Sequence, residues 1–163
     1  MSSHCILMFI YSLIAVISSV SASDLARGFN EKIDWVNLED GLKLSKERNK
    51  PIMMLIHKSW CGACKALGPK FSDSKEIEEL SQNFVMVNIR DDEEPPEKKY
   101  SPDGGYIPRI LFLDTDGEVQ TQYYNEDGSA DYKYYYPDPN QIHKAMKRVL
   151  EGKPQEKVVT DEL

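Results

Sequence analysis

Cysteine is scarce in this chain, and its positions argue against a scaffold held together by disulfides. Among 163 residues only Cys5, Cys61 and Cys64 occur. A small secreted protein that depends on disulfides for stability carries several pairs at long spacings. The scarcity points instead to local sulfur chemistry between Cys61 and Cys64.

The chain also lacks an excess of basic residues. Its 20 Lys and Arg are outnumbered by 27 Asp and Glu, which gives a formal net charge of −7. Nucleic acids and anionic membrane surfaces attract basic proteins, so neither is expected as a main partner. The length suits one domain with a sizeable core. No Asn-x-Ser/Thr sequence occurs, so N-glycosylation is not expected.

Long apolar runs are missing except near the N-terminus. Residues 6–20 are apolar apart from a few hydroxyl-bearing side chains, and a run of about 15 residues is too short to span a bilayer. The small residues of Val20-Ser21-Ala22 follow, as at a signal peptidase site. We therefore predict a secretory signal peptide over residues 1–22 and no membrane span. An uncleaved anchor is the alternative.

The chain ends on Thr160, Asp161, Glu162 and Leu163. Retention signals of the endoplasmic reticulum end in Asp-Glu-Leu. With the signal peptide, this ending predicts location in the endoplasmic reticulum lumen and binding to the receptor for Lys-Asp-Glu-Leu-type signals. A chance acidic tail is the alternative, and Thr in place of Lys leaves the strength of retention open. The predicted domain then covers residues 23–152, and the tail covers residues 153–163.

The motif Trp60-Cys61-Gly62-Ala63-Cys64 lies where a predicted strand passes into a predicted helix. Residues 52–57 are largely apolar and indicate a strand buried on both faces. A helix start offers free N–H groups and a dipole that favours negative charge, which lowers the pKa of a cysteine there. The motif therefore predicts thiol–disulfide exchange, with Cys61 as the attacking thiolate and Cys64 as the resolving thiol.

Periodicity and turn residues predict the remaining elements. Strands are predicted at 33–36, 52–57, 84–89, 109–113 and 118–124, and helices at 38–49, 61–71, 73–82 and 139–151. Strands 52–57 and 84–89 should form a parallel pair joined by a right-handed crossover. The strands at 109–113 and 118–124 should form an antiparallel hairpin.

Smaller features complete this prediction. Residues 23–32 are expected to fray, and residues 132–136 to be extended. Asp73 is the predicted cap of the helix that follows it, with Glu76 completing a capping box. The last helix should bury its apolar side chains, which are Ile142, Met146, Val149 and Leu150.

This order of elements, with Cys-x-x-Cys after the first central strand, resembles the thioredoxin fold. The motif at 60–64 differs from thioredoxin's Trp-Cys-Gly-Pro-Cys only in Ala63, and Ile107-Pro108 matches the position of that family's cis-proline. Residues 57–67, 84–88 and 101–114 resemble more narrowly the small thioredoxin-like proteins of the endoplasmic reticulum, to which the anterior gradient proteins are related.

The resemblance implies a single α/β domain, with a central mixed sheet flanked by helices. It implies a protein-disulfide oxidoreductase acting on secretory client proteins, with glutathione as redox partner and no bound cofactor. Trp60 would cover the disulfide, a core position being the alternative. Gly62 and Ala63 would set a reduction potential between roughly −270 and −180 mV. The Ile107 backbone beside cis Pro108 would bind an extended client.

One position departs from the thioredoxin pattern. Thioredoxin has a buried acidic residue that moves the proton of the second cysteine, and the equivalent residue here is Leu55. Proton transfer from Cys64 must then use water or another group, such as His57 or Lys58. The favoured interpretation of His57 is nevertheless a surface position at the strand end.

Several alternatives stay open. A structural zinc site needs four ligands, and outside residues 1–22 only His57 and His143 accompany the cysteine pair, so no metal is predicted. Residues 91–97 are interpreted as a solvated loop rather than a weak calcium site. Tyr132 and the tyrosines at 134–136 form either a client-binding patch or a layer packed on a helix.

The competing functional class is a client-binding, chaperone-like module with incidental redox activity. Cys64, which the motif of the anterior gradient relatives lacks, favours the enzyme. A secreted structural or signalling protein is a third possibility. The net direction of exchange, the clients and the oligomeric state stay open.

Overall fold

The computed structural model describes residues 22–152. Cys5, most of the predicted signal peptide and the retention-like ending lie outside this range. The helices are α1 (Ala22–Ala26), α2 (Leu38–Arg48), α3 (Gly62–Asp73), α4 (Lys75–Ser81) and α5 (Pro139–Glu151), with short 3₁₀ turns η1 (Asp91–Glu93) and η2 (Lys98–Tyr100). The strands are β1 (Trp35–Val36), β2 (Ile52–His57), β3 (Val85–Arg90) and β4 (Arg109–Leu113).

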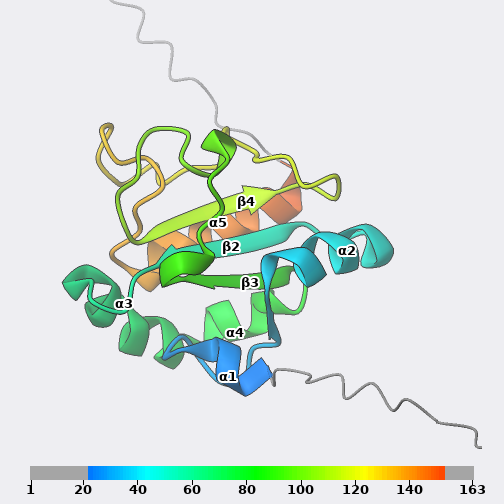
Figure 1. Ribbon diagram of the computed structural model, residues 1–163, viewed down its shortest axis with the longest axis horizontal. Coiled ribbons are helices and arrows are strands. Elements are labelled where there is room, and N and C mark those ends of the chain that lie inside the picture. The colour runs from blue at the N-terminus through cyan, green and yellow to red at the C-terminus, as the bar shows by residue number, and fades with distance from the viewer. Residues whose placement is uncertain (1–21, 153–163) are drawn as a thin grey trace, which may run out of the picture.

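The four strands form one mixed sheet in the order β1-β3-β2-β4 (Figure 1). β3 is parallel to both β1 and β2, whereas β4 is antiparallel to β2. The predicted parallel pair of strands around the cysteine helix is therefore confirmed. β2 is central and every one of its residues is buried, as its apolar sequence predicted.

Each face of the sheet carries its own hydrophobic core. Alternate residues of β2 point to opposite faces, so Met53 and Leu55 pack with side chains from α1, α3, α4 and α5. Met54 and Ile56 pack on the other face, against α2 and the loops around Tyr100 and Tyr134. The predicted central mixed sheet with flanking helices is thus confirmed, and its central strand leads directly into the cysteine motif.

The second strand of the predicted hairpin does not form. The segment after β4 pairs with that strand through one isolated bridge, between Val119 and Leu113. It then turns, and the Thr121 N–H donates to the Val119 carbonyl at 3.1 Å. Further along β4, the Ile110 N–H donates to the Tyr134 carbonyl at 2.9 Å. Because the Tyr134 backbone occupies this edge of β4, the chain beyond residue 120 cannot extend its backbone pairing with β4.

The tyrosine segment is folded rather than extended. A turn brings the Tyr135 N–H to the Tyr132 carbonyl at 3.1 Å. Tyr134 and Tyr136 are buried in the two cores, while Tyr132 is exposed. Packing is therefore the correct interpretation for Tyr134 and Tyr136, because burying their rings stabilises the fold more than exposing them.

Three smaller predictions also fail. Residues 23–32 are not frayed, because Leu25, Ala26 and Phe29 belong to the core. The cap of α4 is Ser74 instead of Asp73, since the Ser74 hydroxyl accepts the Ile77 N–H at 3.3 Å. Leu150 is 39% exposed, whereas its neighbour Val149 packs against the core.

Candidate functional site

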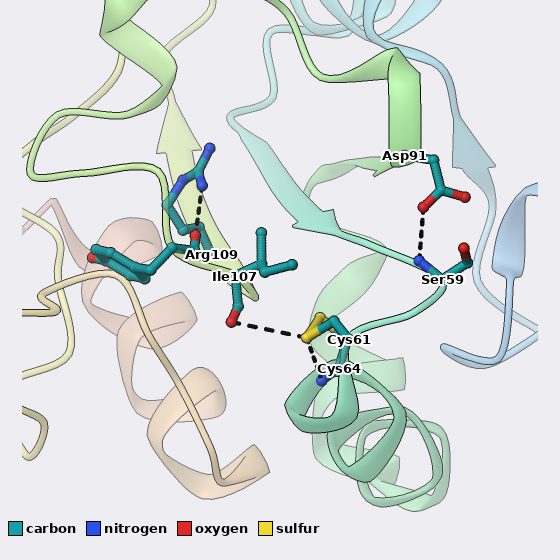
Figure 2. Close-up of a disulfide and its surroundings, with 7 residues drawn as sticks. Ser59, Cys61, Cys64, Asp91, Ile107 and Arg109 are labelled. Carbon is teal, nitrogen blue, oxygen red and sulfur yellow. Dashed lines mark hydrogen bonds between the residues drawn. A yellow bond between two sulfur atoms is a disulfide. The ribbon is translucent and has the colours of Figure 1, made fainter.

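Cys61 and Cys64 form a disulfide at the start of α3 (Figure 2). Cys61 is the N-cap residue of the helix, and its Sγ accepts the Cys64 N–H at 3.1 Å. Both cysteines are buried, whereas Gly62 and Ala63 between them are exposed. An N–H donor aimed at Sγ, together with the positive end of the helix dipole, favours a thiolate at Cys61 whenever the pair is reduced.

The loop before β4 meets the disulfide from the opposite side. The Ile107–Pro108 bond is cis, as expected. The carbonyl oxygen of Ile107 lies 3.9 Å from the Sγ of Cys61 (Figure 2). The predicted neighbours Cys61 and Ile107, which are 46 residues apart in the sequence, are therefore brought together.

Trp60 is 72% exposed beside the disulfide. The alternative of a core aromatic is therefore wrong. An exposed indole next to a buried cysteine leaves a large apolar surface at the place where a partner would approach.

Asp91 holds the loop that leads into the motif. Its carboxylate accepts the Ser59 N–H at 2.7 Å (Figure 2), and its carbonyl accepts from the Lys58 ammonium at 2.6 Å. The hydrogen bond from the Ser59 N–H lowers the pKa of Asp91. Asp91 has a φ of 54°, a left-handed conformation that Asp tolerates better than most residues. The sequence marked Asp91 only as part of a charged loop.

Arg109 joins the acidic loop to the loop that carries Ile107. Its buried guanidinium donates to the Tyr100 carbonyl, to the Tyr106 carbonyl at 2.5 Å and to the Glu94 carboxylate. Lys58 pairs with the same carboxylate at 2.7 Å. Burial alone would raise the pKa of Glu94, but the hydrogen bonds from Lys58 and Arg109 outweigh it and lower that pKa.

Residues 91–94 are half-buried or exposed, in keeping with the solvated-loop interpretation, but three of their carboxylates have partners. Asp91, Glu93 and Glu94 pair with cations or N–H groups on other elements. Arg109 was missed because an arginine after Ile107-Pro108 looks like an ordinary strand residue. Only the fold reveals that three acceptors surround it, which are the Tyr100 and Tyr106 carbonyls and the Glu94 carboxylate.

His57 is 4% exposed, so the expected surface position is wrong. Its Nε2 lies 2.8 Å from the Oδ1 of Asn88, on the neighbouring strand. The ring also meets the edge of Phe29, with centroids 4.8 Å apart. Burial lowers the pKa of His57, and the hydrogen bond with Asn88 opposes that effect. Lys58, the other residue considered for proton transfer, is engaged by Glu94 and Asp91.

The described residues hold neither a metal-binding cluster nor a membrane-spanning helix. Within residues 22–152 no group of three or more His, Cys, Asp and Glu side chains is placed to hold a metal ion. No helix in that range is long and apolar enough to cross a membrane.

Comparison with known proteins decides the family. A family model described as thioredoxin-like matches residues 34–115, which include the motif and the Ile107-Pro108 segment. The chain belongs to the thioredoxin-like family. A thioredoxin from Thermus thermophilus shares the fold, with a TM-score of 0.50 at 15% identity over 71% of this chain and 85% of that one.

Within the thioredoxin-like family, the chain is similar to the anterior gradient proteins. Mouse anterior gradient protein 3 is 36% identical over 77% of this chain and 76% of that protein. The human anterior gradient protein 2 homolog is 34% identical over 77% of this chain and 71% of that protein. A Xenopus tropicalis anterior gradient protein 3 is 44% identical over 55% of each chain. The chain is thus a thioredoxin-fold relative of the anterior gradient proteins, with a close cysteine pair.

Proposed function

We propose that this protein is a thiol–disulfide oxidoreductase of the endoplasmic reticulum lumen that exchanges disulfides with secretory client proteins. The observation that carries the proposal is the Cys61–Cys64 disulfide at the N-terminus of α3, with the Cys64 N–H aimed at the Sγ of Cys61. This placement suits a cysteine pair that alternates between dithiol and disulfide, because the helix terminus stabilises the thiolate that starts each exchange.

The chemistry needs only the two cysteines and a client disulfide. In the reduced protein the Cys61 thiolate attacks one client sulfur, which forms a mixed disulfide and releases the other client sulfur as a thiolate. The Cys64 thiolate then attacks Cys61, closes the Cys61–Cys64 disulfide and releases the second client thiolate. Two electrons pass from the protein to the client, and glutathione can return them. The reverse sequence oxidises a client dithiol.

The surroundings of the pair support binding of an extended client. The Ile107 carbonyl lies beside Cys61 and offers a backbone acceptor to a client strand, as in β-strand addition. The exposed Trp60 adds apolar surface on the motif side. Trp60, Gly62, Ala63, Ile107 and Pro108 would therefore support the reaction of Cys61 and Cys64.

Location in the endoplasmic reticulum rests on the two ends of the sequence. The apolar stretch within residues 1–22 and the ending Thr160 to Leu163 support entry into the secretory pathway and binding to a retention receptor. Comparing the protein in culture medium with that in cell lysate tests the location. Full secretion would contradict retention and favour a secreted protein.

A client-binding module with incidental redox activity is the second candidate. Exposed aromatic rings on both sides of the pair favour it. Trp60 lies on the motif, and the exposed Tyr132 packs against the edge of Tyr106, which precedes Ile107. A double variant with Cys61→Ser and Cys64→Ser separates the two, because a binding module would still hold unfolded clients after both thiols are lost.

The first test of the enzyme is a redox titration of residues 23–163 in glutathione buffers, with trapping of free thiols. We expect a reversible Cys61–Cys64 disulfide with a reduction potential between about −270 and −180 mV. The reason is that Ala63 is neither the Pro that thioredoxin has at this position nor the His of the disulfide isomerases. We also expect Cys64→Ser to accumulate mixed disulfides with a disulfide-containing client.

Cys61→Ser is the matched control, because it keeps the resolving cysteine and lacks the attacking one. It should form few mixed disulfides. Thiols that stay unreactive across the glutathione range, or equal trapping by both variants, would contradict the proposed exchange reaction.

A further inference from the structure

A cavity of about 330 Å³ lies behind the cysteine pair, and Cys64 and His57 both line it. Its other walls come from the loop after α1 and from α3. Gly28 and Gly68 meet there so closely that a Cβ added to Gly68 would lie 3.1 Å from the Gly28 carbonyl oxygen. The cavity has room for water, and polar groups among its lining residues, which include His57 and Lys58, could form hydrogen bonds to that water. It therefore offers a route between the resolving cysteine and a buried imidazole.

The hydrogen bonds around Asn88 determine which nitrogen of His57 carries the proton. The Nδ2 of Asn88 donates to the Ala26 carbonyl at 3.2 Å, so its Oδ1 must face His57. That oxygen can only accept, and it lies 2.8 Å from Nε2. Neutral His57 therefore carries its proton on Nε2, and the lone pair on Nδ1 is left as a base.

The surroundings of the cavity favour a neutral imidazole. The charged side chains that line it are cations, Arg27, Lys58, Lys65 and Arg90. Of these, Arg27, Lys58 and Arg90 pair with Glu93, Glu94 and Asp91. Burial lowers the pKa of His57 most, and the nearby charges of Arg27 and Arg90 lower it further. The hydrogen bond that His57 donates to Asn88 and the charge of Asp91 raise it. His57 is thus unprotonated at neutral pH and able to accept a proton.

We propose that His57 is the proton acceptor for Cys64 during resolution of the mixed disulfide, acting through water in this cavity. It would take the role that thioredoxin gives to a buried carboxylate, which Leu55 cannot fill. This proposal rests on the proposed function, since it concerns the second step of the same exchange.

The step balances as follows. The Cys64 thiol gives its proton through water to the Nδ1 of His57 and becomes a thiolate. That thiolate attacks the Sγ of Cys61, so the Cys61–Cys64 bond forms and the bond from Cys61 to the client breaks. The client sulfur leaves with the electron pair as a thiolate. The His57 imidazolium then returns its proton through solvent, and no further oxidant or reductant is needed for this turnover.

The test is single-turnover reduction of a disulfide-containing peptide by the pre-reduced protein, followed by quenching at successive times. His57→Gln keeps an N–H donor for Asn88 but has no basic nitrogen. We expect it to leave the attack by Cys61 unchanged and to slow resolution about a hundredfold at pH 7, the lower end of typical general base effects. The deficit should shrink above about pH 8.5, where a thiol ionises unaided.

His143→Gln on α5 is the matched control and should resolve the mixed disulfide at the wild-type rate. The His57 proposal is overturned if His57→Gln resolves as fast as the wild type, or if it is slowed equally at every pH. If the wild-type Cys61 forms no mixed disulfide at all, the proposed function itself is refuted and this step falls with it.

A measurement on the wild type covers the case in which His57→Gln does not fold. In ¹⁵N NMR spectra of the reduced protein, His57 should be the Nε2–H tautomer. Its signals should shift once as His57 itself is titrated and a second time as Cys64 ionises. Cys64→Ser should abolish that second shift. An Nδ1–H tautomer, or signals that ignore Cys64, would overturn the proposal.

Discussion

At the scale of single residues, Arg109 connects the segments on either side of the cysteine pair. Its guanidinium binds acceptors on the acidic loop, on η2 and on the loop that presents Ile107. Removing one partner of a buried ion pair leaves the other partners without hydrogen bonds, which is more costly than the pair itself is favourable. The placement of the Ile107 carbonyl beside Cys61 therefore depends on a residue that touches neither.

Arg109→Met should lower the free energy of unfolding by about 3 kcal/mol. The Tyr100 and Tyr106 carbonyls lose this donor, and the Glu94 carboxylate keeps only Lys58. Urea unfolding of the oxidised protein, followed by fluorescence, measures the change. Arg48→Met, at an exposed position in the last turn of α2, is the control and should change stability by less than about 0.5 kcal/mol. Equal effects of the two substitutions would contradict the bridging role of Arg109.

At the scale of elements, α2 lies against the sheet through a glycine. A Cβ added to Gly41 would approach the Cγ2 of Val87 to 2.4 Å, and Val87 is buried in β3. A glycine within a helix is normally unfavourable by about 1 kcal/mol relative to alanine. Here the close approach of helix and strand explains why it is present.

Gly41→Ala should lower the unfolding free energy by about 1 kcal/mol, because the cost of overpacking exceeds the gain in helix propensity. Gly62→Ala, in the first turn of α3, meets no atom within 4 Å of its added Cβ. It should raise stability by up to about 1 kcal/mol. Urea midpoints of the two oxidised variants give the comparison, and a stabilising Gly41→Ala would show that α2 does not lie this close to β3.

At the scale of the whole molecule, stability should depend on pH through three groups whose pKa values the fold lowers: the buried His57 and the less buried Glu93 and Glu94. The pKa of His57 is lowered from 6.5 by burial. Hydrogen bonds from Arg27 lower the pKa of Glu93 from 4.5, and those from Lys58 and Arg109 lower the pKa of Glu94 against the effect of burial. In each case the unfolded chain takes up protons at a higher pH than the folded protein, so acid favours unfolding.

The protein should therefore be most stable near neutral pH and should lose stability in two stages. The first begins as pH falls through 6.5, where His57 becomes protonated in the unfolded chain. The second begins below 4.5, where the two glutamates become protonated there. Urea midpoints between pH 8 and pH 3 measure both stages. His57→Gln should abolish the first stage only, and an unchanged first stage in that variant would contradict the assignment.

Much of the sheet was predictable because its signals are local. The apolar run at 52–57 indicated a doubly buried strand, and the neighbouring strand and helices followed from periodicity. The hairpin after β4 failed because Tyr134, more than twenty residues later, takes the hydrogen bond of Ile110. No local sequence pattern indicates that Tyr134 competes with the predicted second strand for the edge of β4.

The sequence by itself determined the class of fold and the position of the cysteine pair. Two cysteines three residues apart, at a strand-to-helix junction, specify where a disulfide closes and which sulfur meets the helix terminus. Only the tertiary structure decided the surroundings of that pair. Burial of His57, its bond to Asn88 and the anchoring of the motif by Asp91 and Arg109 join segments up to 33 residues apart. Such partners are selected by the packing of the whole chain, since burial and charge pairing depend on distances in space that sequence spacing does not encode.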